Sequence, residues 1–521
     1  MPKFTAHYCS MNFKEYNNSR GEILYYLGSP NLDLLEKLSL GYGDIWHSSF
    51  EQGYKNVFKD IVYQVQVFYW YVNDFDNLDQ CVSWRLNPYL FAVRKSVWEL
   101  LGGFDKEYRN PEIAALDFAY NALAYQAAIP MYVKGLYTET ISKPITISTK
   151  DRYVFYRKNF KMEHSYFMLF RKGIFNLNEW SALHYAKKHF KKRNNIPVVP
   201  ARALQPINGN PTVSYIIPTM MRQDFTLNLL NDLANQTYPP TQVVVVDATP
   251  AEKRDTHLYQ TKTYPFELIV KWQQTKGSCR ARNEAIQLCT SDYIVFGDDD
   301  IRIPPDFIEN HIKLLQTYNA EACNGLDIRA DHQQQNLDDL KVKLEKINPN
   351  RWHVGAGGFN NANSCVSKVY VDKLIGNDIN YDGGYGEDSD FGFSLVKLGI
   401  CVLHNPFSTN LHLKPPVGGY RFWGEQAKIL GKKRKTQPWE LDTPVQYIRP
   451  VPSPTIMYQI VKHYPESQLT EFKYKYFALF LWNGSKMMLP FRLLQLPKRI
   501  LQFNKSVFYA KKLAKLGVRT Q

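Results

Sequence analysis

Long apolar runs and paired cysteines are missing from this sequence. The longest apolar stretch, residues 476–482, has seven residues, whereas a helix that spans a bilayer needs about 20. The seven cysteines of the 521-residue chain are scattered, and no two are spaced as Cys-x-x-Cys. This spacing argues against a disulfide framework and a zinc ribbon, and we expect a reducing compartment. The first 13 residues hold no apolar segment of the secretory type, so we expect the chain in the cytoplasm.

Acidic residues are scarce in two stretches, which makes the positive charge of the chain regional. The formal net charge is +15. Residues 151–200 hold 11 Lys and Arg against 3 Asp and Glu, and residues 451–521 hold 12 against 2, so the rest of the chain is slightly negative. Such regional charge indicates an anionic partner, which is nucleic acid, acidic lipid or acidic glycan.

The basic C-terminal stretch is also rich in large apolar side chains. Residues 496–517 mix Lys and Arg with Leu, Phe and Tyr in the pattern of an amphipathic helix. This composition, without a spanning segment, is typical of an interfacial helix and predicts peripheral binding to the acidic inner face of the plasma membrane. The alternative is a solvated helical bundle that packs on the rest of the chain.

Strand-like and helix-like segments alternate between residues 211 and 300. The predicted strands lie at residues 212–219, 242–249, 266–272 and 292–300, and the predicted helices at residues 224–237 and 278–289. The second strand is a run of β-branched residues, as is typical of a strand buried on both faces. This alternation predicts a mostly parallel, doubly wound α/β sheet whose ligands bind beyond the carboxyl ends of the strands.

Three consecutive aspartates, Asp298, Asp299 and Asp300, come at the end of the fourth predicted strand. Adjacent like charges repel, and a divalent cation would neutralise that repulsion. Hard ions such as Mg²⁺ and Mn²⁺ take oxygen ligands and share them with substrate phosphates. The sequence therefore predicts a metal–phosphate site here, with a solvated acidic turn as the alternative.

Basic residues gather near the start of the second predicted helix. Lys276, Arg280 and Arg282 lie within or just before its first turns. A helix N-terminus together with cations favours a phosphate group. An ordinary basic helix face would show the same residues.

A second acidic cluster, Glu387, Asp388 and Asp390, follows a glycine-rich segment and opens another predicted helix. A carboxylate placed opposite a metal–diphosphate site is what a general base requires. Asp388 could equally be a helix cap. Further along, His412 lies shortly before prolines and glycines, where a lone histidine is either structural or a ligand.

Taken together, these segments resemble the inverting, family 2, GT-A-type glycosyltransferases. The resemblance covers about residues 211–425 and rests on the order and spacing of VSYIIPT, VVVVDAT, GSCRARNEAI, VFGDDD and GEDSDFGFSL, followed by the His-Leu pair. It implies a nucleotide-sugar donor, with uridine as the expected nucleotide, and Mn²⁺ or Mg²⁺ at the Asp-x-Asp motif. It also implies direct displacement at the anomeric carbon, with a carboxylate that activates the acceptor hydroxyl.

The resemblance assigns residues to roles. The residues implied in donor binding are Pro218, Thr219, Asp247, Lys276, Arg282, Asp298 and Asp299. The implied metal ligands are Asp298, Asp300 and His412. Asp388 is implied as the base, with Glu387 beside the acceptor or donor sugar. The loop implied to line the acceptor pocket, residues 351–364, contributes Trp352, Gly357 and Gly358. The second acid that usually follows the second strand is absent, because Ala248 follows Asp247.

The N-terminal region resembles the second half of the same segment. Residues 21–38 parallel 291–308, residues 91–105 parallel 364–378, and residues 115–133 parallel 388–406. Gly28, Ser29 and Pro30 stand where the aspartates would be, and Ala114 and Ala115 where the acidic pair would be. The predicted regions are a non-catalytic GT-A-like domain (1–150), a basic helical connector and linker (151–210), the catalytic domain (211–425) and a basic helical region (426–521). The alternative for the first region is an unrelated α/β domain.

Three functional hypotheses follow. The first is a metal-dependent glycosyltransferase that acts on a glycan or lipid-linked acceptor in cell-surface polysaccharide assembly. The second is a catalytically inactive glycan-binding scaffold, which is hard to reconcile with the retention of every acid in the second copy. The third is a nucleic-acid-binding protein, against which stands the lack of a recognition motif. The sequence leaves the oligomeric state open.

Overall fold

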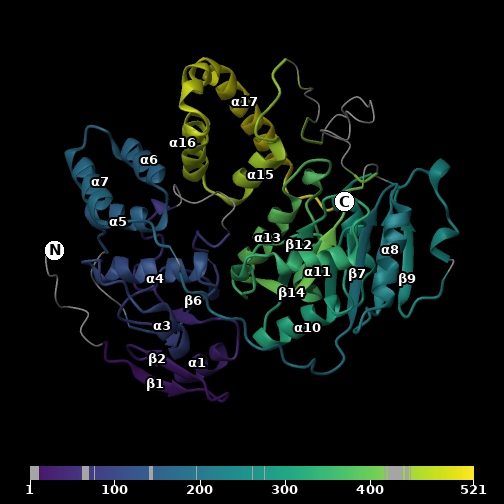
Figure 1. The fold of residues 1–521 in the computed structure, drawn as a ribbon, viewed down its shortest axis with the longest axis horizontal. Helices are drawn as coiled ribbons and strands as arrows, with labels where there is room; N and C mark the ends of the chain where they lie inside the picture. Colours follow the sequence, from purple (N-terminus) through teal and green to yellow (C-terminus); the bar gives the residue numbers. More distant parts are fainter. Residues whose placement is uncertain are drawn as a thin grey trace. The chain divides into compact units, whose positions relative to one another are not determined.

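The computed structural model divides the chain into two compact units (Figure 1). Unit 1 comprises Met1–Ala201 with His353–Ala356, and unit 2 comprises Arg202–Trp352 with Gly357–Gln521. The structure describes residues 11–61, 70–75, 77–139, 145–194, 196–260, 262–274, 276–415, 418–420, 438–440, 445 and 447–521. The predicted boundary between residues 425 and 426 lies outside these residues. Within the described part of the chain, no helix is both long enough and apolar enough to cross a bilayer.

Unit 2 is built on an eight-stranded sheet with the order β11-β14-β12-β13-β10-β7-β8-β9. Its strands are β7 (Val213–Thr219), β8 (Gln242–Asp247), β9 (Glu267–Trp272), β10 (Tyr293–Gly297), β11 (Ile301–Arg302), β12 (Ala322–Arg329), β13 (Asn363–Ser367) and β14 (Val402–His412). The first half of the sheet confirms the predicted strands, because β10, β7, β8 and β9 pair in parallel. Every residue of β7 and β8 is buried, as the run of β-branched residues predicts. The second half is mixed, because β13 pairs antiparallel with both β10 and β12.

The helices of unit 2 flank this sheet and then continue into a C-terminal helical region (Figure 1). They are α8 (Gln223–Ala234), α9 (Ser278–Leu288), α10 (Phe307–Tyr318), α11 (Leu337–Glu345), α12 (Lys368–Leu374), α13 (Glu387–Lys397), α15 (Pro454–His463), α16 (Glu466–Trp482) and α17 (Leu489–Leu516). Helices α8 and α9 confirm the two predicted helices between the parallel strands. Leu230 and Leu233 of α8 are fully buried, so the apolar stripe of this helix faces the core.

Unit 1 has a six-stranded sheet with the order β1-β2-β5-β3-β6-β4. Its strands are β1 (Lys14–Asn17), β2 (Ile23–Tyr26), β3 (Ile45–His47), β4 (Gln80–Val82), β5 (Ala92–Arg94) and β6 (Pro130–Val133). Its helices are α1 (Leu32–Ser39), α3 (Lys95–Leu101), α4 (Pro111–Tyr125), α5 (Thr149–Asn159), α6 (Met162–Lys172) and α7 (Leu177–His189). The last three helices are the basic segment that follows residue 148, and they belong to this compact unit.

Four strands of unit 1 repeat the topology of the second half of the unit 2 sheet. The order β2-β5-β3-β6 corresponds to β10-β13-β12-β14. In both sets the first two pairings are antiparallel and the third is parallel. Helices α3 and α12, which follow β5 and β13, each have seven residues and end at a left-handed residue. The two regions that resemble each other in sequence thus also share the order and direction of four strands.

The strand register shifts the predicted alignment of the aspartates by one residue. Arg94 of β5 and Ser367 of β13 each immediately precede the matching helix, and they pair with Leu24 and Tyr293 respectively. Leu24 therefore corresponds to Tyr293, and Gly28 corresponds to Gly297. Counted from these pairs, the positions of the three aspartates are taken by Ser29, Pro30 and Asn31. The sequence alignment, which placed Gly28 at the first aspartate, is wrong by one residue because it ignored cross-strand pairing.

A buried ionic cluster joins the helices α4 and α5 of unit 1 to the loop before α4 and to the segment after α7. Asp117 on α4 accepts hydrogen bonds from Tyr108 Oη at 2.9 Å and from Asn159 Nδ2 at 2.7 Å. Arg193 forms an ion pair with the same carboxylate at 2.5 Å. Lys158 on α5 pairs with Asp105 at 2.6 Å. Buried carboxylates are stable only when they are paired in this way.

The equivalent cluster in unit 2 has almost the same composition. Asp390 on α13 accepts a hydrogen bond from Tyr381 Oη at 3.0 Å, and His463 Nε2 lies 2.6 Å from its carboxylate. Lys462 on α15 pairs with Asp390 at 2.8 Å and with Asp378 at 3.0 Å. Helix α15 therefore corresponds to α5, which extends the internal repeat into the helical regions.

Two buried histidines predict an acid-sensitive fold. His47 in unit 1 and His311 in unit 2 are fully buried, and burial lowers their pKa values to about 4 and about 3. The unfolded chain takes up these protons below about pH 6.5, whereas the folded chain does not, so stability is lost as the pH falls from 6.5 toward 4. At pH 4 the expected loss is about 3 kcal/mol for each histidine.

This acid sensitivity is measurable as the free energy of unfolding between pH 7 and pH 4. His311→Gln is expected to flatten that pH dependence, whatever its effect at neutral pH. His184→Gln, at an exposed position of α7, is the control and leaves the dependence unchanged. The prediction would be contradicted if the free energy of unfolding changed equally with pH in the unmodified chain and in both variants.

Candidate active site

The carboxyl ends of the parallel strands meet at one cavity of about 240 Å³ in unit 2. Its lining residues come from seven separate parts of the chain and are Pro218, Arg222, Ser278, Arg282, Asp298, Asp299, Asp300, Arg329, Asn360, Glu387, Asp388, His412, Gly418, Gly419 and Tyr420. The structure thus brings both predicted acidic clusters and His412 to a single place. Ligand sites at this edge are the general expectation for open α/β sheets.

Strand β14 carries His412 to the aspartates. The short strand β11 pairs antiparallel with the end of β14, so that Ile301 lies opposite His412. The amide of Leu413 donates to the Asp300 carbonyl at 2.7 Å, which ties the two segments together. One ligand atom each from Asp298, Asp300 and His412 can be chosen so that all lie within 4.8 Å of one another.

Asp327 on β12, which the sequence analysis did not single out, orients the His412 ring. Nδ1 of His412 lies 3.0 Å from Asp327, and Nε2 lies 3.3 Å from Asp300. Burial alone would lower the pKa of His412, but the hydrogen bonds and charges of these two carboxylates outweigh it and raise the pKa to about 10. A carboxylate on the far ring nitrogen of a histidine is the usual support of a metal-binding imidazole.

Arg222 is a second residue that the sequence analysis did not identify. Its Nη1 lies 3.0 Å from Asp299 and 2.9 Å from Asp300. Burial raises the pKa of Asp299 to about 7 against the opposing charge of Arg222. For Asp300, burial also favours the neutral acid, but His412 and Arg222 outweigh it and hold the pKa below its usual value. Asp299 is held further by the Thr219 hydroxyl at 2.7 Å.

Arg282 pairs with Asp298 through a single nitrogen, Nη2, at 2.6 Å. Its Nε and Nη1 atoms are buried without a hydrogen-bond acceptor. Buried guanidinium donors without acceptors are costly, and a bound phosphate would satisfy them. Arg280 does not share this position, because it pairs with Asp382 at 2.9 Å. The start of α9 is capped by the same carboxylate, which accepts the Cys279 amide at 2.7 Å.

Helix α13 begins at the cavity and presents Glu387 and Asp388 in its first turn. The preceding Gly386 has φ of 109°, in the left-handed region that glycine adopts without strain. Asn361 donates its side-chain amide to Asp388, and sequence analysis missed this contact although Asn361 lies in the predicted acceptor loop. The buried Asp390 anchors the same helix two residues further on. This helix end therefore places a carboxylate in the same cavity as the aspartates, which a general base at this site requires.

Within the described part of the chain, several residues that the resemblance implies in binding do not line this cavity. Asp247 is fully buried and accepts hydrogen bonds from Tyr259 Oη at 2.9 Å and from the Thr249 amide at 2.8 Å. Lys276 is exposed. From the implied acceptor loop, Asn360 reaches the cavity, whereas Trp352, Gly357 and Gly358 lie outside its lining. The amide of Gly357 donates to the Val402 carbonyl at 2.7 Å.

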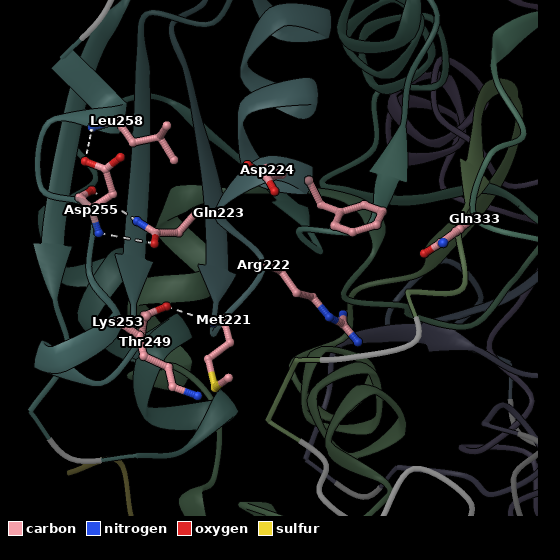
Figure 2. A pocket seen from close by; sticks show the side chains of 10 residues that line it. Met221, Arg222, Gln223, Asp224, Thr249, Lys253, Asp255, Leu258 and Gln333 are labelled. Carbon is pink, nitrogen blue, oxygen red and sulfur yellow. Dashed lines mark hydrogen bonds between the residues drawn. The ribbon is translucent and has the colours of Figure 1, made fainter. Parts of the chain in front are cut away.

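A neighbouring cavity of about 430 Å³ shares Arg222 with the acidic one (Figure 2). The amide of Met221 donates to Thr249 Oγ1 at 2.8 Å, which joins the loop after β7 to the end of β8. On the other side, Gln223 Nε2 donates to the Asp255 carbonyl at 3.2 Å. Arg222 is therefore the side chain between the two cavities.

The acidic cavity has the donor set that a hard divalent cation requires. Asp298 and Asp300 offer carboxylate oxygens, and His412 offers an imidazole nitrogen whose orientation is fixed by Asp327. Mixed oxygen and imidazole ligands suit Mn²⁺ and related ions. The residues present therefore fit a metal ion.

Arg222→Ala is expected to lower the thermal stability of the metal-free protein and to enlarge the stabilisation by Mn²⁺. Removing the guanidinium leaves the adjacent carboxylates of Asp299 and Asp300 with less positive charge nearby. We expect this to lower the free energy of unfolding by about 3 kcal/mol. Arg302→Ala is the matched control, because the ion pair that Arg302 forms, at 2.7 Å, is with the buried Asp232 of α8. Its loss of stability should not be recovered by Mn²⁺ in a thermal melt. Equal recovery in both variants would contradict the prediction.

A mostly parallel α/β sheet with an Asp-x-Asp motif at its carboxyl edge defines the GT-A class of glycosyltransferase domain. Residues 214–357 match the family described as Glycosyl transferase family 2. This segment of the chain is therefore similar to the family 2 glycosyltransferases. Asp388 and His412 lie beyond the matched residues.

Curated relatives that match part of the chain include two bacterial proteins. WcaA of Escherichia coli (strain K12), named for colanic acid biosynthesis glycosyl transfer, is 27% identical over 128 residues, which is 23% of this chain and 46% of WcaA. TuaG of Bacillus subtilis (strain 168), named for teichuronic acid biosynthesis, is 23% identical over 109 residues, which is 21% of this chain and 43% of TuaG. The chain thus spans less than half the length of these relatives.

Solved structures with a similar fold include S. aureus TarS 1-349, with a TM-score of 0.36 and 15% identity over 58% of this chain and 83% of that one. The mannosyltransferase PcManGT from Pyrobaculum calidifontis, in complex with GDP-Man and Mn²⁺, has a TM-score of 0.34 and 17% identity over 68% of this chain and 98% of its own.

Proposed function

We propose that the chain is a metal-dependent inverting glycosyltransferase of cell-surface polysaccharide assembly. It would move a sugar from a nucleotide-sugar donor, with uridine as the expected nucleotide, to a hydroxyl of a glycan or lipid-linked acceptor. The observation that carries the proposal is the single cavity that collects Asp298, Asp300, His412, Arg282 and Asp388. The polysaccharide names of the two relatives support the substrate class.

The donor diphosphate would lie against the aspartates and Arg282. A divalent cation held by Asp298, Asp300 and His412 would supply positive charge beside the leaving diphosphate. The two buried donors of Arg282, which have no acceptor among the described residues, would bind phosphate oxygens and hold the leaving group in place. Thr219 and Pro218, at the end of β7, would border the nucleoside, and Asp247 would act on it through the Thr249 segment.

The acceptor hydroxyl would lie on the Asp388 side of the cavity. Asp388 would take the hydroxyl proton as the oxygen attacks the anomeric carbon, and Asn361 would keep its carboxylate oriented. Glu387, one residue earlier in the same helical turn, would contact a sugar. Attack from this side, opposite the diphosphate, produces inversion. Trp352, Gly357 and Gly358 remain assigned to the outer part of the acceptor site.

A panel of nucleotide sugars tests the proposal in two steps. A thermal shift with Mn²⁺ identifies the donor that stabilises the chain, because a ligand that binds only the folded state raises the melting temperature. Release of the nucleoside diphosphate from that donor then measures turnover. Stabilisation without release would identify a glycan-binding scaffold instead. Binding to DNA at physiological salt, with no response to any nucleotide sugar, would favour the nucleic-acid hypothesis.

A further inference from the structure

Each compact unit carries a helical hairpin, and the two hairpins correspond. In unit 1 it is α6–α7, and in unit 2 it is α16–α17 (Figure 1). Helix α7 packs on α5, as α17 packs on α15. The sequence Tyr-Ala-Lys-Lys occurs once in each packing helix, at residues 185–188 of α7 and 509–512 of α17. The internal repeat therefore includes both hairpins.

The turn of the first hairpin exposes a cluster of large apolar side chains. This first tip consists of Phe170, Ile174, Phe175, Leu177 and Trp180. Phe175 is 92% exposed and Leu177 is 82% exposed. Trp180 Nε1 donates to the Ile174 carbonyl at 2.5 Å, so the turn is held in a defined shape rather than frayed. Water-soluble surfaces rarely gather apolar side chains in this way without a partner.

The turn of the second hairpin has the same character. This second tip consists of Trp482, Met487, Met488, Phe491, Leu493 and Leu494. Met487 is 86% exposed and Leu494 is 79% exposed. Arg492 Nη1 donates to the Leu481 carbonyl at 3.0 Å, which ties the start of α17 to the end of α16. Equivalent turns of two repeats are thus both apolar, although their sequences differ.

The predicted interfacial helix, residues 496–517, has both a buried and an exposed apolar side. Phe503, Tyr509 and Leu513 are buried, so these side chains pack inside the protein. Leu501, Phe508 and Leu516 are exposed, and the larger exposed fractions lie earlier, at the second tip. The membrane contact predicted for this helix therefore stays a prediction.

The charge around the tips selects one kind of partner. Exposed lysines accompany both hairpins. Lys172 lies beside the first tip, where it pairs with Asp60, and Lys486 and Lys498 lie at and just after the second tip. The exposed Lys187 and Lys188 lie at the other end of α7, away from the first tip. Residues 466–516 hold 10 Lys and Arg against 2 Asp and Glu. Apolar and aromatic side chains backed by lysines are complementary to the anionic surface of a bilayer, where the side chains enter the interface and the lysines meet the headgroups.

We propose that both hairpin tips insert into the interfacial region of a bilayer that contains anionic phospholipid. A single shallow insertion gives only marginal binding, and a second insertion by the same chain into the same bilayer would strengthen it because that step is intramolecular. Two-point attachment explains why both copies of the repeat keep an apolar turn. The proposal goes beyond glycosyl transfer and does not depend on it.

Vesicle co-sedimentation of the full chain tests this proposal. We expect binding to phosphatidylcholine vesicles with roughly 30% phosphatidylglycerol and little binding to phosphatidylcholine alone. The double substitutions Phe175→Ser with Leu177→Ser, and Phe491→Ser with Leu494→Ser, should each weaken binding about tenfold. All four together should reduce it to the level of the neutral vesicles. Added salt should weaken binding of the unmodified chain.

Exposed apolar residues elsewhere provide the control. Val342→Ser with Val369→Ser changes two exposed side chains of α11 and α12, and we expect it to leave vesicle binding unchanged. Equal loss in this control, or full binding by the four-substitution variant, would overturn the proposal. A concentration-dependent dimer that the tip substitutions dissolve, with no vesicle binding, would also overturn it and identify the tips as contacts between copies. Donor-induced stabilisation, measured in parallel, reports on the glycosyltransferase site independently.

Discussion

Asp388→Asn is expected to reduce glycosyl transfer by about a thousandfold while leaving the fold and donor binding intact. The amide has nearly the same size as the carboxylate but cannot take the proton of the acceptor hydroxyl. Asp388 lies in the first turn of α13, whose anchor is the buried Asp390, so the substitution should not disturb the helix. Transfer is measured as nucleoside diphosphate release in the presence of acceptor, and donor binding as the thermal shift.

Two further substitutions serve as comparisons for Asp388→Asn. Asn361→Ala removes the amide that orients Asp388, and we expect a smaller fall in kcat, about tenfold, with KM for the donor unchanged. Asp338→Asn changes an exposed carboxylate of α11 and should have no effect. If Asp388→Asn retained full activity, the base would be another group and the inverting mechanism assigned to this cavity would be wrong.

Asp300→Asn is expected to abolish both the response to Mn²⁺ and turnover. Asp300 is a ligand in the proposed metal site and is also the partner of His412 Nε2 at 3.3 Å. Its loss removes a charged ligand and leaves the leaving diphosphate without full charge compensation, which should cost about a thousandfold in transfer or more. The measurement is the melting temperature with and without Mn²⁺, followed by diphosphate release.

Two further measurements separate loss of the metal from loss of the fold. Asp372→Asn, at an exposed carboxylate of α12 that pairs with Lys368, should keep the full Mn²⁺ response. Treatment of the unmodified chain with a chelator should give the same loss of activity as Asp300→Asn and should be reversed by Mn²⁺. An unmodified chain that transfers sugar equally well in chelator would refute the metal assignment.

Most of the candidate site could be predicted because it lies at strand and helix ends. The end of a buried strand is visible in the sequence as the run that leads into Asp298, and a glycine-rich start of a helix is visible before Glu387. The partners of these residues could not be predicted in the same way. Arg222, Asp327 and Asn361 sit in segments without a distinguishing pattern, and only their hydrogen bonds with the acidic residues and His412 reveal their roles.

The first copy of the repeat shows a different limit of prediction from the sequence. Sequence similarity identified the matching segments, but cross-strand pairs fix which residue stands opposite which, and they moved the aspartate positions to Ser29, Pro30 and Asn31. The later helices of the repeat, α5–α7 and α15–α17, share little beyond the Tyr-Ala-Lys-Lys sequence. Their correspondence became visible only through the paired ionic clusters around Asp117 and Asp390.

The sequence by itself determined the parallel part of the sheet, because a fully apolar run flanked by amphipathic helices has few other stable arrangements. It also determined that acids cluster at the strand ends. The tertiary structure alone decided which distant residues meet these acids. His412 reaches Asp300 because β14 pairs with β11, and Arg222 reaches it because the loop after β7 turns toward the same edge. Such meetings depend on strand order and register, which are set by packing across the whole unit and leave no local trace in the sequence.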